Sequence, residues 1–222
     1  MARQARQNRP QLVVVLADDS GSMRGPKAEA ATMGLREMIM ECQSRGPAGV
    51  DRSYFRLLLI SFETLASVVP HCDMRPIREI DPETIQLSAM GGSTNLTAAL
   101  DIAYDRLLAH IAEIEKHPER DRHPLPIVLI FSDGEHNEGF DPRPVAERIK
   151  ALAIDGESVV IAAAGIGLSG GFGEMVLRTI ASPECYVDIR NVSQLSAFIS
   201  SVGSSGASGS KAVSSVIKKL QP

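Results

Sequence analysis

Residues 12–23 read LVVVLADDSGSM, and this stretch decides the expected fold. A continuous apolar run of this kind is typical of a strand covered on both faces, as in a parallel sheet. The polar turn that follows carries Asp18, Ser20 and Ser22 in the spacing Asp-x-Ser-x-Ser. Open α/β sheets bind their ligands at the carboxyl ends of the strands, where this turn must lie. One carboxylate and two hydroxyls are hard oxygen ligands suited to Mg²⁺ or Mn²⁺, and the glycine between the serines relieves crowding.

Two later segments supply what such a site still lacks. Residues 91–96, GGSTNL, place the hydroxyl of Thr94 at a glycine-rich helix start. Residues 127–134, IVLIFSDG, are a second buried-type strand, and Asp133 follows its end. Because strand ends and helix starts adjoin in a doubly wound sheet, we expect one metal site from three loops. The predicted metal ligands are Asp18, Ser20, Ser22, Thr94 and Asp133.

In this order, the three segments resemble the metal-ion-dependent adhesion site of the von Willebrand factor A (vWA) family, and the resemblance extends over residues 11–203. It implies a doubly wound, Rossmann-like α/β fold. It also implies that five side chains bind Mg²⁺ or Mn²⁺ in preference to Ca²⁺, with one coordination position left for an Asp or Glu of a partner protein. The implied function is metal-dependent protein binding and not catalysis. Asp19 stands at the variable position of the motif, and we expect it to point away from the metal.

A narrower resemblance concerns residues 19–25, DSGSMRG, and residues 198–202, FISSV, which precede a serine-rich tail. These segments look like those of the bacterial tellurite-resistance (TerY-like) group of vWA proteins. That group implies a stand-alone cytoplasmic chain in a stress response, with a kinase, a phosphatase or another stress-response protein as its partner.

Two other functions use the same oxygens. A Mg²⁺-dependent hydrolase or phosphotransferase is one, but the first loop lacks the second aspartate of an Asp-x-Asp phosphatase loop, and no lysine motif completes a nucleotide site. A structural subunit of an ATPase or chelatase assembly is the other. It differs from a binding module only in its partner, so the sequence does not separate the two.

A late glycine loop, residues 165–171, matches both G-x-G-x-x-G and G-x-S-x-G. Dinucleotide sites place these glycines after the first strand of the βαβ unit, a position taken here by the Asp-x-Ser-x-Ser turn. A nucleophile elbow at Ser169 would need a later histidine, and the last histidine of the chain is His136. We therefore expect no cofactor site and no catalytic residue. His136, Glu135 and Glu138 follow the third loop and are expected as solvated rim residues.

Composition limits the function further. The 222 residues are 44% hydrophobic and 23% charged, which fits one α/β domain. The net charge of −4 argues against a nucleic-acid partner. No apolar stretch is long enough to cross a bilayer and the polar start has no signal-type segment, so we expect a cytoplasmic protein without membrane contact. Cys42, Cys72 and Cys185 are odd in number and widely spaced, which favours free thiols.

Periodicity divides the chain into a polar N-terminal arm (1–10), the vWA domain (11–203) and a Gly/Ser-rich flexible tail (204–222). The end of the tail has the spacing of a short amphipathic helix, which either packs back or engages a partner. Alternating strands and helices predict a mostly parallel sheet with helices on both faces, and the short link after residue 62 predicts one antiparallel edge strand. The expected helices cover 26–43, a long segment capped by Thr94 or its neighbour, a segment from 141, 174–181 and 193–202 capped by Ser193. The expected strands after the first cover 54–62, 65–69, 127–132, 158–164 and 186–189.

Overall fold

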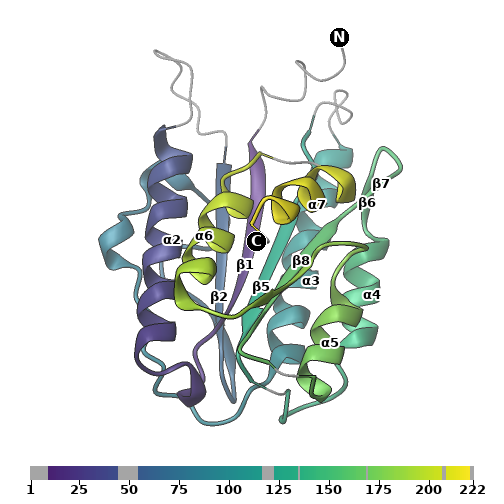
Figure 1. Cartoon of the computed structure of the whole chain (residues 1–222). Coiled ribbons are helices and arrows are strands. Elements are labelled where there is room, and N and C mark those ends of the chain that lie inside the picture. Colours follow the sequence, from purple (N-terminus) through teal and green to yellow (C-terminus); the bar gives the residue numbers. More distant parts are fainter. Residues whose placement is uncertain are drawn as a thin grey trace.

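The structure is a computed structural model, shown in Figure 1. It describes residues 10–44, 55–116, 123–134, 136–168, 170–206 and 209–220. The predicted N-terminal arm lies outside the described residues except for Pro10, and so do Glu135 and Ser169.

A mostly parallel sheet forms the centre of the molecule. Its strand order is β3-β2-β1-β5-β8-β9, with β4 also paired to β2. All neighbours on this path are parallel except β3, which runs antiparallel to β2 at the edge, as does the short β4. The predicted fold class is therefore confirmed. The strands are β1 (Gln11–Asp18), β2 (Phe55–Phe62), β3 (Ala66–Val68), β4 (Arg75–Pro76), β5 (Ile127–Ser132), β8 (Val160–Ile166) and β9 (Tyr186–Ile189).

Helices cover both faces of this sheet (Figure 1). One face carries α2 (Pro26–Ser44), α6 (Val192–Gly203) and α7 (Ser210–Lys218), and the other carries α3 (Leu96–Glu115), α4 (Arg143–Ala151) and α5 (Phe172–Ile180). The remaining short elements are the 3₁₀ turns η2 (Gly21–Met23), η3 (Ile77–Glu79) and η4 (Pro82–Thr84) and the hairpin β6 (Ala153–Ile154) and β7 (Glu157–Ser158).

Strand β1 lies between two layers of helices, which explains its unbroken apolar sequence. Val13 and Val15 pack in the cluster that contains α2, α6 and α7, while Leu12 and Val14 pack in the cluster of α3, α4 and α5. Successive side chains of a strand point to opposite faces, so a strand buried on both faces needs apolar residues at every position. The end of β1, where Asp18 lies, is thereby fixed in the middle of the sheet.

The backbones of α2 and α6 approach very closely. A Cβ atom on Gly34 would lie 2.8 Å from the Cα atom of Ser196, so glycine is required at this crossing. The Ser196 hydroxyl donates a hydrogen bond to Oε2 of Glu37 at 2.8 Å. The helix that follows the first predicted metal loop is therefore held by a segment from the other end of the domain.

Two asparagines cap the helices. Asn95 Oδ1 accepts from the amide of Ala98 (3.1 Å) at the start of α3. Asn191 forms a capping box with Gln194 at the start of α6. The prediction that Ser193 caps this helix is wrong, because Ser193 lies in the first turn and donates to Asn191 Oδ1 at 2.6 Å.

The C-terminal helix α7 packs back on the domain. Val213 and Ile217 are buried in the same cluster as α2 and α6. Lys218 Nζ forms an ion pair of 2.8 Å with Glu184 Oε2. The sequence leaves open whether this segment packs back on the domain or engages a partner. In the structure, α7 packs back on the domain.

All three cysteines are free and buried. Burial raises the pKa of the Cys72 thiol to about 11, so it stays protonated at neutral pH. Within the described residues, none of the helices has the length and apolar character needed to span a membrane.

Candidate metal centre

The first predicted ligand, Asp18, is a carboxylate buried at the end of β1. Its Oδ1 accepts from the amide of Ser20 at 2.9 Å, and its Oδ2 accepts from the hydroxyl of Ser132. Burial raises the pKa of Asp18, and the hydrogen bonds from Ser132 and Ser20 oppose that rise. A buried carboxylate of this kind is stabilised by a cation placed beside it.

The two serines of the first loop connect Asp18 to the third loop. Ser20 Oγ and Ser22 Oγ lie 3.0 Å apart. Ser22 Oγ donates to Asp133 Oδ1 at 2.7 Å, and the Asp133 side chain is 0% exposed. The hydroxyls and both carboxylates thus form one continuous polar network at the carboxyl ends of β1 and β5.

A backbone contact joins the first and second loops. Ser20 forms an isolated parallel bridge with Gly91, and a Cβ atom on Gly21 would lie only 2.8 Å from the Gly91 carbonyl oxygen. Asp19 points away from this network, because its carboxylate accepts from the amide of Ala89 (2.5 Å) and the hydroxyl of Ser88 (3.1 Å). Its orientation is as predicted, and it holds the segment that leads into the second loop.

Thr94 is buried and held by the third loop. Its amide donates to Asn137 Oδ1 at 2.8 Å, and its carbonyl accepts from the Asn137 amide at 3.2 Å. From the other side, Glu63 Oε2 accepts from the amide of Gly92 (3.1 Å) and the Glu63 carbonyl accepts from that of Asn95 (2.7 Å). The backbone of the second loop is therefore fixed from both sides.

The space beside Gly134 shows how the five side chains converge. A Cβ atom on Gly134 would lie 3.2 Å from Thr94 Oγ1, 3.6 Å from Ser22 Oγ and 3.9 Å from Asp18 Oδ2. The absence of a side chain at this position on the third loop keeps open a space that oxygen atoms of the first and second loops border. The structure thus brings together all five residues that the sequence predicts as ligands, Asp18, Ser20, Ser22, Thr94 and Asp133.

The donor set fits a hard divalent cation. Two carboxylates and three hydroxyls offer oxygen only, which suits Mg²⁺ or Mn²⁺ better than a soft metal. The described part of the chain holds no cluster of three or more His, Cys, Asp or Glu side chains placed to bind a metal. Asp73, whose neighbour Cys72 could also bind a metal, is engaged in an ion pair: both of its carboxylate oxygens accept from Arg106, at 3.0 and 3.1 Å.

Two residues that bond to the carboxylates of this site were missed by sequence reasoning, besides Asn137 and Glu63, which hold the second loop. Lys27, in the first turn of α2, places its ammonium group against Asp133 Oδ2 and 3.4 Å from the carbonyl oxygen of Ser22. Ser132, the last residue of β5, bonds to Asp18. Both residues contact predicted ligands in the folded structure. Ser132 also directly precedes Asp133 in the sequence, and this adjacency is the one feature of the sequence that could have indicated its role.

His136 is not the solvated rim residue that the sequence suggested. Its Nδ1 accepts from the amide of Leu96 at 3.3 Å, and its Nε2, which must then carry the proton, donates to the carbonyl of Phe140 at 2.7 Å. Backbone groups therefore occupy both ring nitrogens, so His136 supports the start of α3. Glu138 is exposed.

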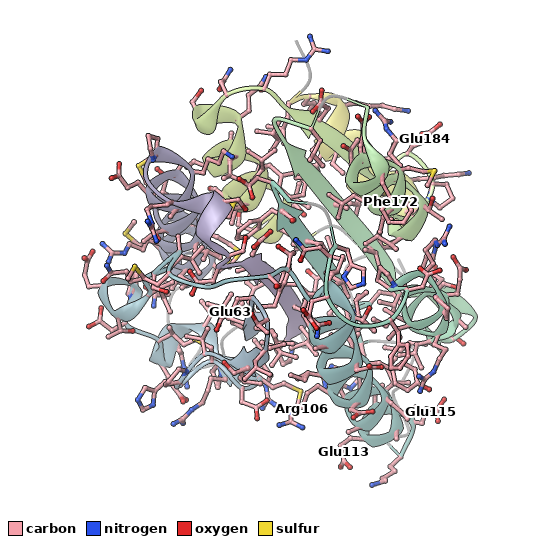
Figure 2. All side chains as sticks on the ribbon, turned by 90° about the horizontal axis from the view of Figure 1, so that it is seen from below. Glu63, Arg106, Glu113, Glu115, Phe172 and Glu184 are labelled. Atoms are coloured by element: carbon pink, nitrogen blue, oxygen red, sulfur yellow. The ribbon has the colours of Figure 1, made fainter. Side chains whose placement is uncertain are left out.

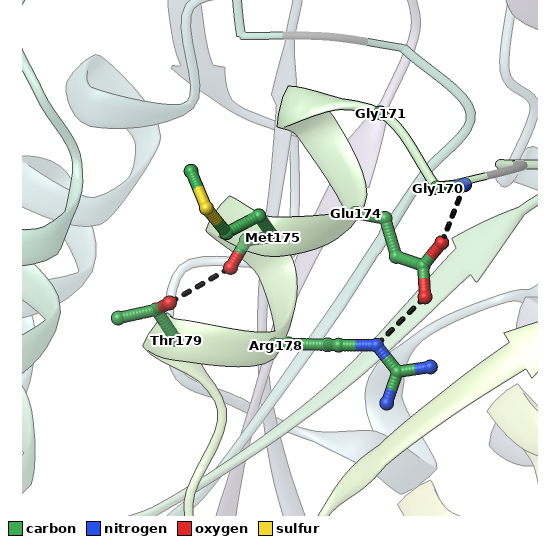
Figure 3. Close-up of a pocket in the computed structure, with 6 residues that line it drawn as sticks. All are labelled: Gly170, Gly171, Glu174, Met175, Arg178 and Thr179. Carbon is green, nitrogen blue, oxygen red and sulfur yellow. Dashed lines mark hydrogen bonds and ion pairs between the residues drawn. The ribbon is translucent and has the colours of Figure 1, made fainter.

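The late glycine loop borders a shallow depression of about 360 Å³, drawn in Figure 3. Glu174 Oε2 accepts from the amide of Gly170 at 2.8 Å, and its other oxygen accepts from Arg178 at 2.7 Å. A carboxylate therefore stands at the helix start where the pyrophosphate of a dinucleotide would have to bind. Arg178 also lies over the ring of Tyr186, 4.3 Å from its centre, so the charges of this depression are paired internally.

Solved structures share this fold at low sequence identity. Proximal thread matrix protein 1 from the mussel byssus is 24% identical with a TM-score of 0.63, and the match covers 86% of this chain and 46% of that one. A form of the same protein with a zinc-occupied MIDAS motif is 22% identical, with a TM-score of 0.62 and the same coverage. Manganese-loaded TRAP protein from Plasmodium vivax is 18% identical with a TM-score of 0.51, over 82% of this chain and 68% of that one. The chain thus spans less than half the length of the mussel protein. At these identities the likeness shows the fold alone.

No curated protein sequence matches the chain. The model of the von Willebrand factor type A domain matches residues 13–136, which are more than half of the chain and contain all three loops of the site. This family model does not distinguish the tellurite-resistance group within the family. By its sequence, its fold and the arrangement of its loops, the chain belongs to the von Willebrand factor A family.

Proposed function

We propose that this chain is a metal-dependent protein-binding module whose site holds Mg²⁺ or Mn²⁺. The observation that carries the proposal is the convergence of oxygen atoms of Asp18, Ser22 and Thr94 beside Gly134, with Asp133 joined to them through Ser22. Asp18 and Asp133 would supply charge, and Ser20, Ser22 and Thr94 would supply neutral oxygens. Ca²⁺, which takes six to eight ligands at longer distances, suits this compact set less well.

The proposed partner presents an Asp or Glu side chain. The bound ion would supply the positive charge that attracts this carboxylate and would accept it as a ligand. Asp18 and Asp133 together carry a charge of −2 when ionised and Lys27 adds +1, so a bound divalent ion leaves the site with a net positive charge. The loops hold their oxygens in place through backbone contacts, so little ordering remains to be done when the partner binds.

Binding is favoured over the hydrolase or phosphotransferase alternative by the neighbours of the site. A hydrolase needs a base within hydrogen-bond reach of the attacking water. Both nitrogens of His136 are engaged by backbone groups, and Asp19 is engaged by Ala89 and Ser88. His136 and Asp19 are therefore committed to supporting the loops, and neither is available as that base.

The physiological setting that we propose is a cytoplasmic stress response of the tellurite-resistance kind, with a kinase or phosphatase as partner. Its support is the resemblance of residues 19–25 and 198–202 to that group. Co-purification from the native cell with and without EDTA, followed by mass spectrometry, would identify the partner. A partner retained fully in EDTA would contradict the proposal.

Calorimetric titration with Mn²⁺ tests the metal site itself. The unchanged chain should bind one ion, and the variant Asp18→Ala/Asp133→Ala should bind none. The matched control is Asp73→Ala/Asp141→Ala, which removes two exposed, ion-paired carboxylates elsewhere and should bind Mn²⁺ normally. Circular dichroism confirms that each variant is folded. Unchanged Mn²⁺ binding by the Asp18→Ala/Asp133→Ala variant would refute the site.

Thr94→Ala is the sharper test of partner binding. It removes one oxygen from the site and leaves both carboxylates and the apolar core intact. We expect a loss on the order of 1 to 3 kcal/mol in partner binding, as for a missing buried hydrogen-bonding group, and a much smaller change in thermal stability.

A further inference from the structure

The loop that follows the third metal ligand displays an aromatic ring on a fixed backbone. The Phe140 side chain is 87% exposed, yet its carbonyl oxygen accepts two hydrogen bonds. One comes from the Thr97 hydroxyl, and the other comes from His136 Nε2 at 2.7 Å. Thr97 is itself buried in the first turn of α3. The ring therefore projects into solvent from a backbone position that two side chains hold.

The same loop supports the metal site. Asn137 holds Thr94 through two hydrogen bonds, and Gly139 lies so close to Asn95 that a Cβ atom there would come within 2.6 Å of Oδ1. Gly139 has a φ of +83°, a conformation that glycine adopts without strain. Residues 136–140 thus hold the backbone of the proposed ligand Thr94 through Asn137 and end in an exposed phenylalanine.

Three more large apolar side chains lie exposed close after strand ends or beside the second metal loop, at this edge of the sheet. Leu65 follows β2 and is 75% exposed, Met90 precedes the second metal loop and is 73% exposed, and Phe172 begins α5 and is 50% exposed. Figure 2 looks onto this edge from below, with Glu63 near β2 and Phe172 on opposite sides of the centre. Single exposed apolar residues are ordinary, but four around one site indicate an interaction surface. We call Leu65, Met90, Phe140 and Phe172 the apolar rim.

We propose that the apolar rim, with Phe140 as its anchor, binds the apolar side chains that flank the partner's acidic residue. The occupant is an extended segment of another protein in which an Asp or Glu has apolar neighbours. This inference rests on the proposed function, because the metal site would bind the acid. An aromatic ring on a backbone that is already fixed loses less entropy on binding than one on a mobile loop, and aromatic residues are among those that dominate interface energies.

The charges around the site suit such a segment. Arg24 is exposed on the first loop, and Lys27, which follows it in the first turn of α2, is paired with Asp133. Two acidic side chains of the loops are committed to the protein itself: Asp19 accepts from Ala89 and Ser88, and Glu63 accepts from Gly92. Glu138 is exposed on the third loop. On the first loop the exposed charge is therefore the positive charge of Arg24, and it complements an acidic segment.

A phage-displayed library of random 12-residue peptides tests this proposal without a known partner. The library is selected on the full chain in Mn²⁺ and, in parallel, in EDTA. Phe140→Ser removes the anchor but keeps the backbone carbonyl and its two hydrogen bonds. Leu108→Ser is the matched control, since Leu108 is a half-exposed apolar residue on α3 outside the rim.

We expect Mn²⁺ to select peptides with one acidic residue and an apolar residue at a fixed spacing, for the unchanged chain and for Leu108→Ser alike. Phe140→Ser should still select peptides with the acidic residue, but the enrichment of the apolar residue among them should fall at least fivefold. A selected peptide should bind Phe140→Ser at least tenfold more weakly in fluorescence polarisation, with the Mn²⁺ affinity of the variant unchanged.

Two outcomes would overturn the inference, and they are distinguishable. In the first outcome, Mn²⁺ selects acidic peptides, but Phe140→Ser selects the same apolar residues as the unchanged chain. This result would contradict the role of the apolar rim and would leave the proposed metal-dependent function intact. Peptide pools that are the same in Mn²⁺ and EDTA, or no enrichment in Mn²⁺, would refute the proposed function together with the rim.

Discussion

The ammonium group of Lys27 contacts Oδ2 of Asp133, while the hydroxyl of Ser22 donates to Oδ1 of the same carboxylate at 2.7 Å. The Asp133 side chain has no exposed surface, and Lys27 reaches it from the first turn of α2. One oxygen of this proposed ligand, Oδ2, therefore has a positively charged lysine side chain beside it. A divalent ion that binds the same carboxylate has to do so against that charge.

Replacing Lys27 should therefore tighten metal binding. We expect Lys27→Met to bind Mn²⁺ about tenfold more tightly, which corresponds to about 1.4 kcal/mol. Calorimetric titration at low ionic strength measures this, because salt screens the repulsion. Lys218→Met, which breaks an exposed ion pair with Glu184, is the matched control and should leave Mn²⁺ binding unchanged. Equal or weaker binding by Lys27→Met would show that the lysine does not oppose the metal.

Asn137 should matter for metal affinity although it is no ligand. Asn137→Ala removes the acceptor for the Thr94 amide, so the Thr94 hydroxyl loses part of its support. One hydrogen bond is worth about 0.5 to 1.5 kcal/mol, and we expect Mn²⁺ binding to weaken about threefold to tenfold. Asn191→Ala removes the cap of α6, whose side-chain bonds go to Gln194 and Ser193, and should lower the melting temperature without changing Mn²⁺ affinity. The same Mn²⁺ affinity in both variants would speak against a positioning role for Asn137.

His110 should make stability depend on pH. Burial, with smaller contributions from Arg56 and His123, lowers the pKa of His110 from 6.5 to about 4. Between pH 6.5 and pH 4 the unfolded chain therefore binds a proton that the folded protein excludes, so the free energy of unfolding falls as the pH falls. Urea unfolding in EDTA at pH 7 and pH 4.5 should show an acid loss on the order of 2 kcal/mol greater in the unchanged chain than in His110→Asn.

The control for this experiment is the exposed His71. His71→Asn should lose as much stability on acidification as the unchanged chain. If His110→Asn also does so, His110 is not the group responsible.

The close crossing of α2 and α6 should not tolerate a methyl group. In an exposed helix, Gly→Ala would stabilise the protein by about 1 kcal/mol. Gly34→Ala places its Cβ 2.8 Å from the Cα of Ser196, a backbone atom that no side-chain rotation can move. We expect a net loss of about 1 to 3 kcal/mol in urea unfolding. Met33→Ala, at a half-exposed neighbouring position, should change stability by less than about 0.5 kcal/mol. A Gly34→Ala protein as stable as the unchanged chain would mean that the helices separate freely.

The sheet and the convergence of the proposed ligands were predictable because they depend on local patterns. Apolar runs fixed β1 and β5, and the rule that parallel strands end at one edge brought Asp18 and Asp133 together. The hairpin of β6 and β7 also had a signal that went unused. Asp155 and Gly156 both adopt positive φ, and an Asp-Gly pair is typical of such two-residue turns.

The supporting residues were not predictable, because their roles depend on distances across the fold. Nothing near Asn137 in sequence indicates that it binds the backbone of Thr94, and Lys27 reads as an ordinary surface lysine on α2. Serine and asparagine are comparable helix caps, so only the observed bond to Gln194 identifies Asn191 over Ser193.

The packing of α2 on α6 also has a consequence for the order of events during synthesis. Glu37 and Ser196, which join the two helices, lie 159 residues apart in the chain. At about 5 to 20 residues per second, α6 leaves the ribosome roughly 10 to 30 s after α2. Throughout that interval the apolar side of α2 lacks the helix that covers it, and the first metal loop lacks a settled α2 behind it. The nascent protein therefore exposes this apolar surface, unless a chaperone covers it, until α6 has emerged, which is after all three ion-binding loops have left the ribosome.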